Sequence, residues 1–474
     1  MRQLEGALRS YAWGSRTALA ELCGRPSPSA HPEAELWLGA HPGDPAHVIE
    51  DGGTRSLRDV IDAAPLSELG ERSVAQFGER LPFLLKVLAA EEPLSLQAHP
   101  SAEQAREGFA REDAVGIPVD SAERNYRDAS HKPELVVALT RFEALAGFRD
   151  PHRTVRFLQA LEVEQLAPYV GLLAGQPDPD GLRALFTTWI TLPSPALSAL
   201  LPPVLDGCVR YLSRPDAAEA EFVPEARTAL ELSEGYPGDA GVLAALLLNR
   251  ITLEPGQGLF LAAGNLHAYL HGTAVEIMAN SDNVLRGGLT PKHVDVPELL
   301  RVLDFDSVDV PLLAPAPTGR PGEVAYATPA AEFVLTRIDL DASDAGSEVS
   351  VTIEPDGPQI LLCTSGAAKL GCGPHSLVLE RGGAAWISAS DNEVHIQACA
   401  DDTQIFRAGV GADAPFRGPA RDRAARIPRE CRLGVSSQVR RRVAKPCWRR
   451  PTGIGFLHPH LRGGSDGDVR PECR

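Results

Sequence analysis

Long apolar runs and paired cysteines are missing from this sequence of 474 residues. The longest apolar run, Val242–Leu248, has seven residues, whereas a membrane helix needs roughly 18. The first residues also lack the apolar core of a signal peptide. None of the eight cysteines forms a CxxC pair, which argues against a zinc ribbon or a thioredoxin motif. Unpaired thiols are typical of a reducing compartment, so we expect a cytoplasmic protein without a membrane partner.

Positive charge is scarce in most of the chain. The net charge of −17 combines two unlike parts: residues 415–474 carry 15 basic and 5 acidic residues, and residues 1–414 carry 31 basic and 58 acidic residues, a net of −27. Nucleic-acid binding needs a basic face, so we expect no nucleic-acid partner for the acidic body. An anionic substrate would have to be held by a local cluster of cations. Only five of the 46 basic residues are lysines.

The chain changes character along its length. The first 150 residues predict mostly short strands and loops, such as Glu35–Gly39 and Leu94–His99, with one helix over 101–111 that begins at the N-cap Ser101. Apolar residues then recur at helical spacing up to about residue 250, in segments separated by proline-containing breakers that include Pro202-Pro203. These helical segments are Val155–Leu161, Gly181–Trp189, Ala196–Leu212 and Pro224–Leu232. Strand patterns resume at Ile251.

The segment Pro93–Pro100 holds the first candidate for chemistry. Gln97 and His99 are two residues apart, so on a strand both side chains leave the same face. An amide oxygen and an imidazole nitrogen on one face can bind one cation, although two polar residues on an exposed face would look the same. Further along, a charged loop that contains Lys132 and Glu134 leads into the apolar strand Leu135–Leu139, which is also a common structural pattern.

Two later segments add polar side chains. His267 lies in the stretch 264–272, and the run Asn280–Asn283 leads into Leu285–Lys292. A single histidine is more often structural than a ligand, and a run of short polar residues is typical of a turn. Three of the five lysines, Lys86, Lys132 and Lys292, lie in or beside these segments, which favours sites that need a compact ammonium group. Lys86 also fits the edge of a core.

The four segments, taken in this order, resemble the type I phosphomannose isomerases, which are zinc enzymes of the cupin class. The early stretches Tyr11–Gly14 and Ala34–Pro42 belong to the same pattern. The resemblance runs from about Leu4 to Phe305 and more loosely to Gly409.

The resemblance implies a site residue by residue. It implies that one zinc ion is bound by Gln97, His99, Glu134 and His267. It implies that Arg286 is catalytic, that Lys132 and Asp282 move protons or bind sugar, and that Lys292 holds phosphate beside Arg286. One carboxylate, two imidazoles and a neutral amide leave a net positive zinc site. Whether Lys132, a carboxylate or a zinc-bound water is the general base stays open.

The resemblance also implies the architecture, a mainly β fold of two jelly-roll (cupin-like) units with an all-α insert. The split catalytic unit is predicted at 1–150 and 251–310, with the helical domain at 151–250. A second jelly-roll unit is predicted at 321–410. Residues 415–474 are predicted to be a disordered basic tail, because they show neither helical nor strand periodicity and little apolar surface.

The implied reaction interconverts D-mannose 6-phosphate and D-fructose 6-phosphate through a cis-enediol intermediate, in a monomer or weak homo-oligomer whose partner is a small hexose 6-phosphate. The alternative is a non-catalytic cupin that binds a sugar phosphate. A second rival is an iron enzyme of oxygen chemistry, for which two histidines and one carboxylate are suitable ligands. Gln97 would occupy a position that such iron sites leave open.

Overall fold

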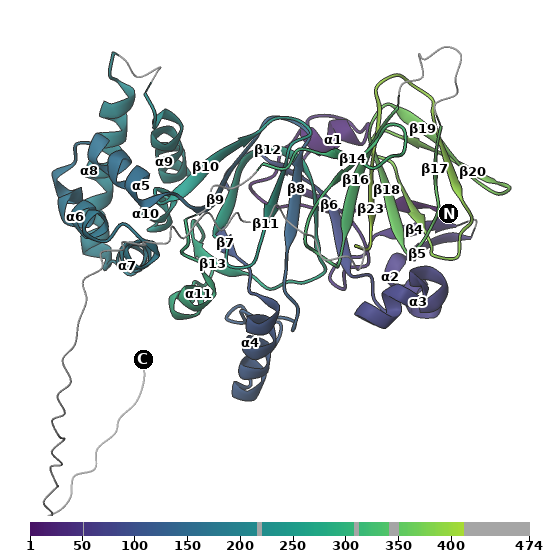
Figure 1. The fold of residues 1–474 in the computed structure, drawn as a ribbon, viewed down its shortest axis with the longest axis horizontal. Helices are drawn as coiled ribbons and strands as arrows, with labels where there is room; N and C mark the ends of the chain where they lie inside the picture. Colours follow the sequence, from purple (N-terminus) through teal and green to yellow (C-terminus); the bar gives the residue numbers. More distant parts are fainter. Residues whose placement is uncertain (51, 216–219, 308–311, 341–349, 412–474) are drawn as a thin grey trace, which may run out of the picture. The chain divides into compact units, whose positions relative to one another are not determined.

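Antiparallel sheets dominate the structure, a computed structural model that describes residues 1–50, 52–215, 220–307, 312–340 and 350–411. All described strand pairs are antiparallel, and they form sheets of ten, nine and four strands (Figure 1). The predicted basic tail, 415–474, lies outside the described residues.

The ten-stranded sheet draws on segments from both sides of the predicted helical insert. Its path runs β10-β9-β12-β6-β3-β2, and β7, β8, β11 and β13 pair beside it. In chain order the strands are β2 (Ala7–Arg9), β3 (Glu35–Leu38), β6 (Phe83–Ala90), β7 (Leu96–Ala98), β8 (Glu134–Ala138), β9 (Phe142–Phe148), β10 (Leu248–Leu253), β11 (Gly258–Leu261), β12 (His267–Ala279) and β13 (Leu285–Gly288). Strands from before and after the insert are therefore direct neighbours.

The nine-stranded sheet combines the two ends of the described chain. Its order is β14-β15-β16-β23-β18-β21-β1-β4-β5, with strands β1 (Arg2–Glu5), β4 (His47–Glu50), β5 (Gly53–Ser56), β14 (Ala316–Pro317), β15 (Glu323–Tyr326), β16 (Val334–Leu340), β18 (Gln359–Ser365), β21 (Ala384–Ile387) and β23 (Thr403–Gly409). The four-stranded sheet consists of β17 (Ser350–Ile353), β22 (Val394–Ala398), β19 (Ala367–Cys372) and β20 (His375–Glu380). The division into domains stays a prediction, and the pairing of β1 with β21 joins residues placed in different predicted units.

Alternation of side chains explains how the sheets stack, because successive residues of a strand face opposite sides. In β18, Ile360 and Leu362 belong to the core shared with the ten-stranded sheet, while Leu361 and Cys363 belong to the core shared with the four-stranded sheet. In β6, alternate residues from Phe83 to Ala89 pack into the first of these cores. The intervening residues face the other side of the ten-stranded sheet.

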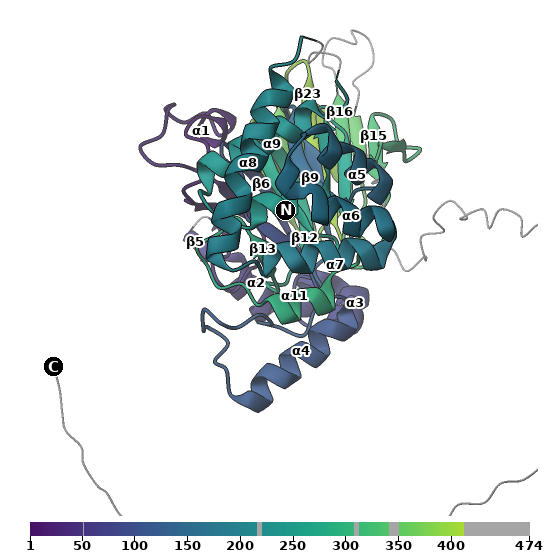
Figure 2. The same cartoon turned by 90° about the vertical axis from the view of Figure 1, so that its left-hand side faces the viewer.

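The helices form two groups. The first group lies between strands and comprises α1 (Ala18–Leu22), α2 (Leu57–Ala63), α3 (Pro65–Phe77), α4 (Ala102–Val115) and α11 (Val296–Val302). The second group forms a continuous helical portion and comprises α5 (Pro151–Ala160), η1 (Glu164–Leu166), α6 (Ala167–Gly175), α7 (Pro179–Ile190), α8 (Ser194–Leu212), α9 (Val223–Gly235) and α10 (Gly241–Ala245). Figure 2 looks onto this helical portion. Its core is continuous with apolar residues of β7, β9, β12 and β13, so it supports the same strands that carry the candidate site.

The mainly β fold with a helical portion is confirmed. The predicted cap Ser101 is also confirmed, because α4 begins there with a capping box that includes Gln104. Two other local predictions need correction. Pro202 and Pro203 do not end a helix, because both lie inside α8, where buried Leu201 and Val204 pack into the helical core. The first 150 residues also hold more helix than the single one predicted.

Within the described ranges, no single helix is long and apolar enough to cross a membrane. The helices α7 and α8, which meet at a bend of 110°, reach the length and apolar composition of a membrane span only when they are counted together.

Candidate metal and sugar-phosphate site

Strand pairing brings the predicted metal-binding residues together. β7 lies between β12 and β13, with Gln97 opposite both His267 and Arg286. Directly opposed residues point to the same face of a sheet, so these three side chains share one face. His99 follows β7, and Glu134 begins β8, which pairs with β12. His99, Glu134 and His267 are buried, and one ligand atom from each lies within 4.8 Å of the others.

Backbone carbonyls determine which nitrogen of each imidazole carries the proton. His99 Nδ1 lies 2.8 Å from the carbonyl oxygen of Asn283, and His267 Nδ1 lies 3.0 Å from the carbonyl oxygen of Asn265. A carbonyl oxygen only accepts hydrogen bonds, so each Nδ1 carries the proton and each neutral ring offers the Nε2 lone pair. These are the outer partners that histidine ligands of metals commonly have.

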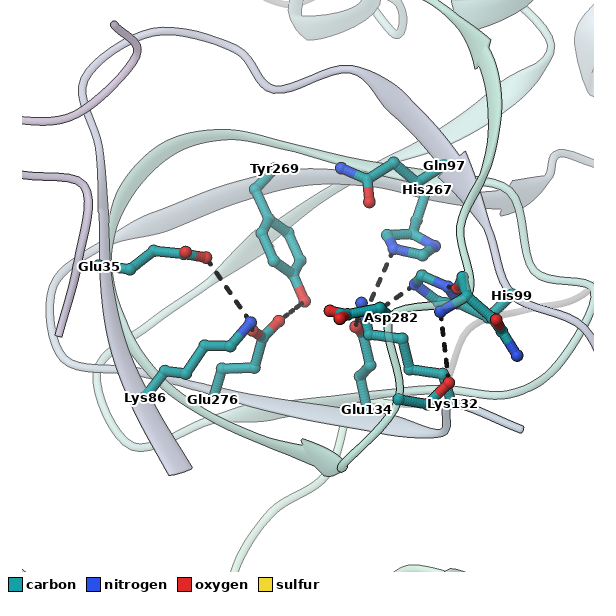
Figure 3. A network of polar contacts seen from close by, with 12 residues as sticks. Glu35, Lys86, Gln97, His99, Lys132, Glu134, His267, Tyr269, Glu276 and Asp282 are labelled. Atoms are coloured by element: carbon teal, nitrogen blue, oxygen red, sulfur yellow. Dashed lines mark hydrogen bonds and ion pairs between the residues drawn. The ribbon is translucent and has the colours of Figure 1, made fainter. Parts of the chain in front are cut away.

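The two Nε2 atoms face the Glu134 carboxylate without a proton between them. His99 Nε2 lies 3.3 Å from Glu134 Oε1, and His267 Nε2 lies 3.5 Å from Glu134 Oε2 (Figure 3). His99 Nε2 is buried and has no hydrogen-bond partner. Lone pairs facing carboxylate oxygens repel one another unless a cation lies between them. Neighbouring donors of a tetrahedral zinc ion with bonds of about 2.0–2.1 Å are about 3.3 Å apart, so these donors fit zinc.

Gln97 supplies the fourth predicted donor. Its amide nitrogen donates to Ser95 Oγ at 3.4 Å, which leaves its carbonyl oxygen free to bind a cation. In Figure 3 the Gln97 side chain lies beside the His267 ring and faces the same space. Sequence spacing alone placed Gln97 and His99 on one face, and the pairing with His267 gives that face its position in the sheet.

The ionisation states suit a cation. Burial lowers the pKa of His99 to about 4, so this ring is neutral, the form that binds metals, at neutral pH. Burial alone would raise the pKa of Glu134, but the neighbouring His99 and Lys132 hold it well below its usual value. Lys132 Nζ lies 3.2 Å from Glu134 Oε1. The carboxylate is therefore ionised and has an ammonium group beside it.

Asp128 and Asn283 tie two loops together around His99. Both carboxylate oxygens of Asp128 accept from the Ser281 hydroxyl, at 2.9 and 3.0 Å, and one also accepts from the backbone N–H of Asp282 at 3.0 Å. The Asn283 side chain accepts from the backbone N–H of Arg127 at 2.7 Å and donates to the carbonyl of Asp128 at 2.8 Å. The Asn283 carbonyl that orients His99 is therefore held by the segment that leads to Lys132 and Glu134.

Asp282 lies in the wall of a cavity of about 650 Å³ that His41, Arg127 and Asp128 also line. Burial raises the pKa of Asp282, but a hydrogen bond from His41 and the positive charges of Lys132 and Arg127 outweigh that effect and leave it below its usual value. The predicted residue Asp282 is therefore an ionised carboxylate at the edge of an open cavity.

Arg286 and Lys292 are cations without an ion-pair partner among the described residues. Burial lowers the pKa of Arg286, and the positive charge of Arg127 adds to this effect. Burial, Arg286 and Arg127 together lower the pKa of Lys292. Three mutually repelling cations in an acidic protein form the local cluster that an anionic substrate requires. Arg127 is a member that the sequence analysis did not identify.

A second cluster of charged residues lies beside the predicted metal donors; the sequence analysis noted its Lys86 without assigning it a role. Lys86 Nζ is 3.2 Å from Glu276 Oε2 and 3.7 Å from Glu35, and the Tyr269 hydroxyl donates to Glu276 at 2.7 Å. Glu35, Glu276 and Lys86 come from β3, β12 and β6, and Lys86 is the cross-strand neighbour of Glu276. The signal in the sequence was one lysine within the apolar strand β6 and one glutamate within the apolar end of β12.

The last predicted β block also reaches this site. Glu332, which precedes β16, has one carboxylate oxygen 2.6 Å from His131 Nε2. Its other oxygen is buried and has no hydrogen-bond partner. His131 directly precedes Lys132, so a residue of the 321–410 segment contacts the loop that carries Lys132 and leads into Glu134 of β8.

Comparisons with known proteins agree with this geometry. A family model for the catalytic domain of type I phosphomannose isomerase matches residues 1–151. Mannose-6-phosphate isomerase from Escherichia coli K12 is 41% identical over 398 residues, which are 84% of this chain and 97% of that protein. Mannose-6-phosphate isomerase 1 from Arabidopsis thaliana is 31% identical over 429 residues, with 87% of this chain and 94% of that protein covered.

Solved structures show the same similarity. A single-residue variant of phosphomannose isomerase from Salmonella typhimurium superposes with a TM-score of 0.78 at 38% identity, covering 87% of this chain and all of that chain. A zinc-bound, holo mannose 6-phosphate isomerase superposes with a TM-score of 0.77 at 38% identity, covering 87% of this chain and 99% of that chain.

Proposed function

The chain belongs to the mannose-6-phosphate isomerase family, and we propose that it interconverts D-mannose 6-phosphate and D-fructose 6-phosphate with one zinc ion bound by Gln97, His99, Glu134 and His267. One observation carries the proposal: the imidazole lone pairs of His99 and His267 face the Glu134 carboxylate at 3.3 and 3.5 Å, with no hydrogen bond at His99 Nε2. A resident cation resolves that arrangement, and a zinc ion is also what the solved relative contains.

A cluster of cations explains the preference for a phosphorylated sugar. Lys292 is exposed, Arg286 is partly buried, and neither has a carboxylate partner in the described ranges. We assign phosphate binding to Lys292 with Arg286, and Arg127 adds positive charge at the same place. Because the rest of the body is acidic, a phosphate dianion gains favourable electrostatic energy only near such a local group.

The isomerisation moves a proton between C1 and C2 of the open-chain sugar. In the proposed mechanism the pyranose ring first opens, and the proton transfer then passes through a cis-enediol. Negative charge develops on the C1 and C2 oxygens, and fixed cations stabilise such charge strongly because they need no reorganisation during the reaction. Zinc, when bound, polarises substrate oxygens as a Lewis acid.

The protein's own residues divide the remaining tasks. Arg286 shares one sheet face with Gln97 and His267, which supports its proposed role of stabilising the developing oxygen charge. Lys132 and Asp282 are proposed to move protons or bind sugar hydroxyls, since the first is an ammonium group beside Glu134 and the second an ionised carboxylate at the cavity.

We propose in addition that the two β units are jelly rolls of the cupin type. The support is that antiparallel strands distant in sequence, such as β1 and β21 or β7 and β13, are direct neighbours, as the double Greek keys of jelly rolls require. A monomeric or weakly oligomeric state stays a prediction, which sedimentation at several protein concentrations tests.

A coupled isomerase assay with metal analysis tests the function. The purified protein is given D-mannose 6-phosphate, and D-fructose 6-phosphate is measured before and after chelation and after zinc is restored. We expect zinc-dependent turnover. Binding of the sugar phosphate without turnover would instead support the non-catalytic alternative, and stoichiometric iron in place of zinc would support the oxygen-chemistry rival. Unphosphorylated mannose serves as the matched control for the phosphate requirement.

A further inference from the structure

His41 is a buried histidine outside the metal site, in the connection between β3 and β4. It is 5% exposed, and its ring meets the ring of Trp37 edge-on, with centroids 4.8 Å apart. Its Nδ1 lies 3.1 Å from the backbone N–H of Gly43, and its Nε2 lies 3.2 Å from Asp282 Oδ1. The ring is therefore held by packing on one side and by a polar partner at each nitrogen.

These contacts determine which ring nitrogen of His41 donates a hydrogen bond. A backbone N–H only donates, so Nδ1 accepts from Gly43 and carries no proton. The proton of the neutral ring is then on Nε2, which donates to the Asp282 carboxylate. Because the ring packs edge-on against Trp37 and Nδ1 is engaged, the direction of this Nε2–H bond is set before substrate arrives.

Asp282 is fixed at a second point. Its backbone N–H donates to Asp128 Oδ2 at 3.0 Å, and its Oδ1 is engaged by His41. Its Oδ2 has no protein partner in the part of the chain that the structure describes, and its side chain is 44% exposed in the wall of the cavity. One carboxylate oxygen is thus used for orientation, and the other is available to a ligand.

We propose that His41 is a positioning residue of the isomerisation, which orients the Asp282 carboxylate through Nε2–H so that the free oxygen of Asp282 faces bound sugar. The inference rests on the proposed isomerase function, and on Asp282 taking part in it. In this proposal His41 acts through Asp282 rather than on the sugar directly.

The charges around Asp282 set the expected pH behaviour. His41 faces it from the β3–β4 connection, and Lys132, Arg127 and Asp128 face it from the loop before β8. The first three favour the ionised carboxylate, and Asp128 opposes it. Without the hydrogen bond from His41, burial raises the pKa of Asp282 relative to the wild-type enzyme. A larger fraction of Asp282 is then protonated at the acidic end of the activity range.

Two amide variants separate positioning from simple packing. His41→Asn keeps a polar group near the Nδ1 position and is too short to reach Asp282, whereas His41→Gln places an amide N–H near the Nε2 position. For the zinc-loaded His41→Asn enzyme we expect kcat about 10–100-fold lower, the size of effect known for losing an outer hydrogen-bond partner at a metal site. We also expect little change in KM and an acidic limb of the pH–rate profile shifted to higher pH. His41→Gln should recover much of kcat and the wild-type limb.

Zinc content, thermal melting and a double variant complete the test. If both variants lose activity in parallel with zinc or melting temperature, His41 is only structural. An unchanged kcat and pH profile in a zinc-loaded His41→Asn enzyme also overturns the inference. In an Asp282→Asn background, His41→Asn should have no further effect on kcat, and this comparison is available even if the single variant folds poorly. Absence of turnover in the wild-type protein would instead contradict the proposed function.

Discussion

Replacing Arg286 with alanine separates catalysis from stability. Arg286 is partly buried on β13, has no ion-pair partner among the described residues, and is repelled by Arg127. Its removal relieves that repulsion while losing some packing of the side-chain stem, so we expect the free energy of unfolding to change by less than about 1 kcal/mol. Losing one fixed charge at a developing oxyanion costs about 10²–10³ in rate, or roughly 2.7–4 kcal/mol of transition-state stabilisation.

Arg407 provides the matched control, because it is an arginine paired with a buried carboxylate. It bonds Glu323 at 2.6 Å in the nine-stranded sheet, away from the metal donors. Arg407→Ala should destabilise the protein by about 1.5–3 kcal/mol, the usual contribution of a hydrogen bond to a charged group, and leave kcat unchanged. Steady-state kinetics and denaturant unfolding of both variants give the comparison. If Arg286→Ala raised only KM, or lowered kcat only as far as it lowered stability, the catalytic role would be wrong.

Three further changes have defined outcomes. Lys292→Ala should raise KM for the phosphorylated sugar about tenfold, with a weaker dependence of KM on salt than in wild type; an unchanged KM would assign the phosphate to other cations. Glu332→Gln weakens the hydrogen bond to His131, so we expect kcat to fall several-fold while zinc is retained. If the Glu332→Gln enzyme instead had the kinetics of wild type, the contact would be incidental. Burial raises the pKa of the Glu323 carboxyl, but Arg407 and Arg320 reverse this effect and lower the pKa. The ionised Glu323 therefore stabilises the fold above its unfolded-state pKa of about 4.3, and this contribution is lost as the pH falls below that value. Equal acid sensitivity of Glu323→Gln and wild type, measured by denaturant unfolding, would refute this prediction.

The four predicted metal donors were selected by the resemblance to a family, because it rests on long motifs. Strand periodicity suggested only that Gln97 and His99 leave the same face, which two exposed polar residues would also do. Nothing local distinguishes Glu134 and His267 from structural residues. The pairing of β7 with β12 then explains why residues 170 positions apart, Gln97 and His267, are neighbours.

The partners of these residues could not be predicted, because they come from long-range contacts. Asn283 orients His99 with its backbone carbonyl, which every residue has, so its side chain carried no signal for that role. His41 meets Asp282 across 241 positions of sequence. Pro202 and Pro203 favour a helix end locally, yet tertiary packing of α8 overrides that preference.

The amount of zinc bound per chain, compared between wild type and Glu134→Gln, tests the central claim most directly. The substitution keeps the shape of the side chain and removes the negative charge that the two imidazole lone pairs face. We predict about one zinc per wild-type chain and a large loss of zinc and turnover in Glu134→Gln, with the β fold retained by circular dichroism. A Glu134→Gln protein with wild-type zinc content and turnover would contradict the account.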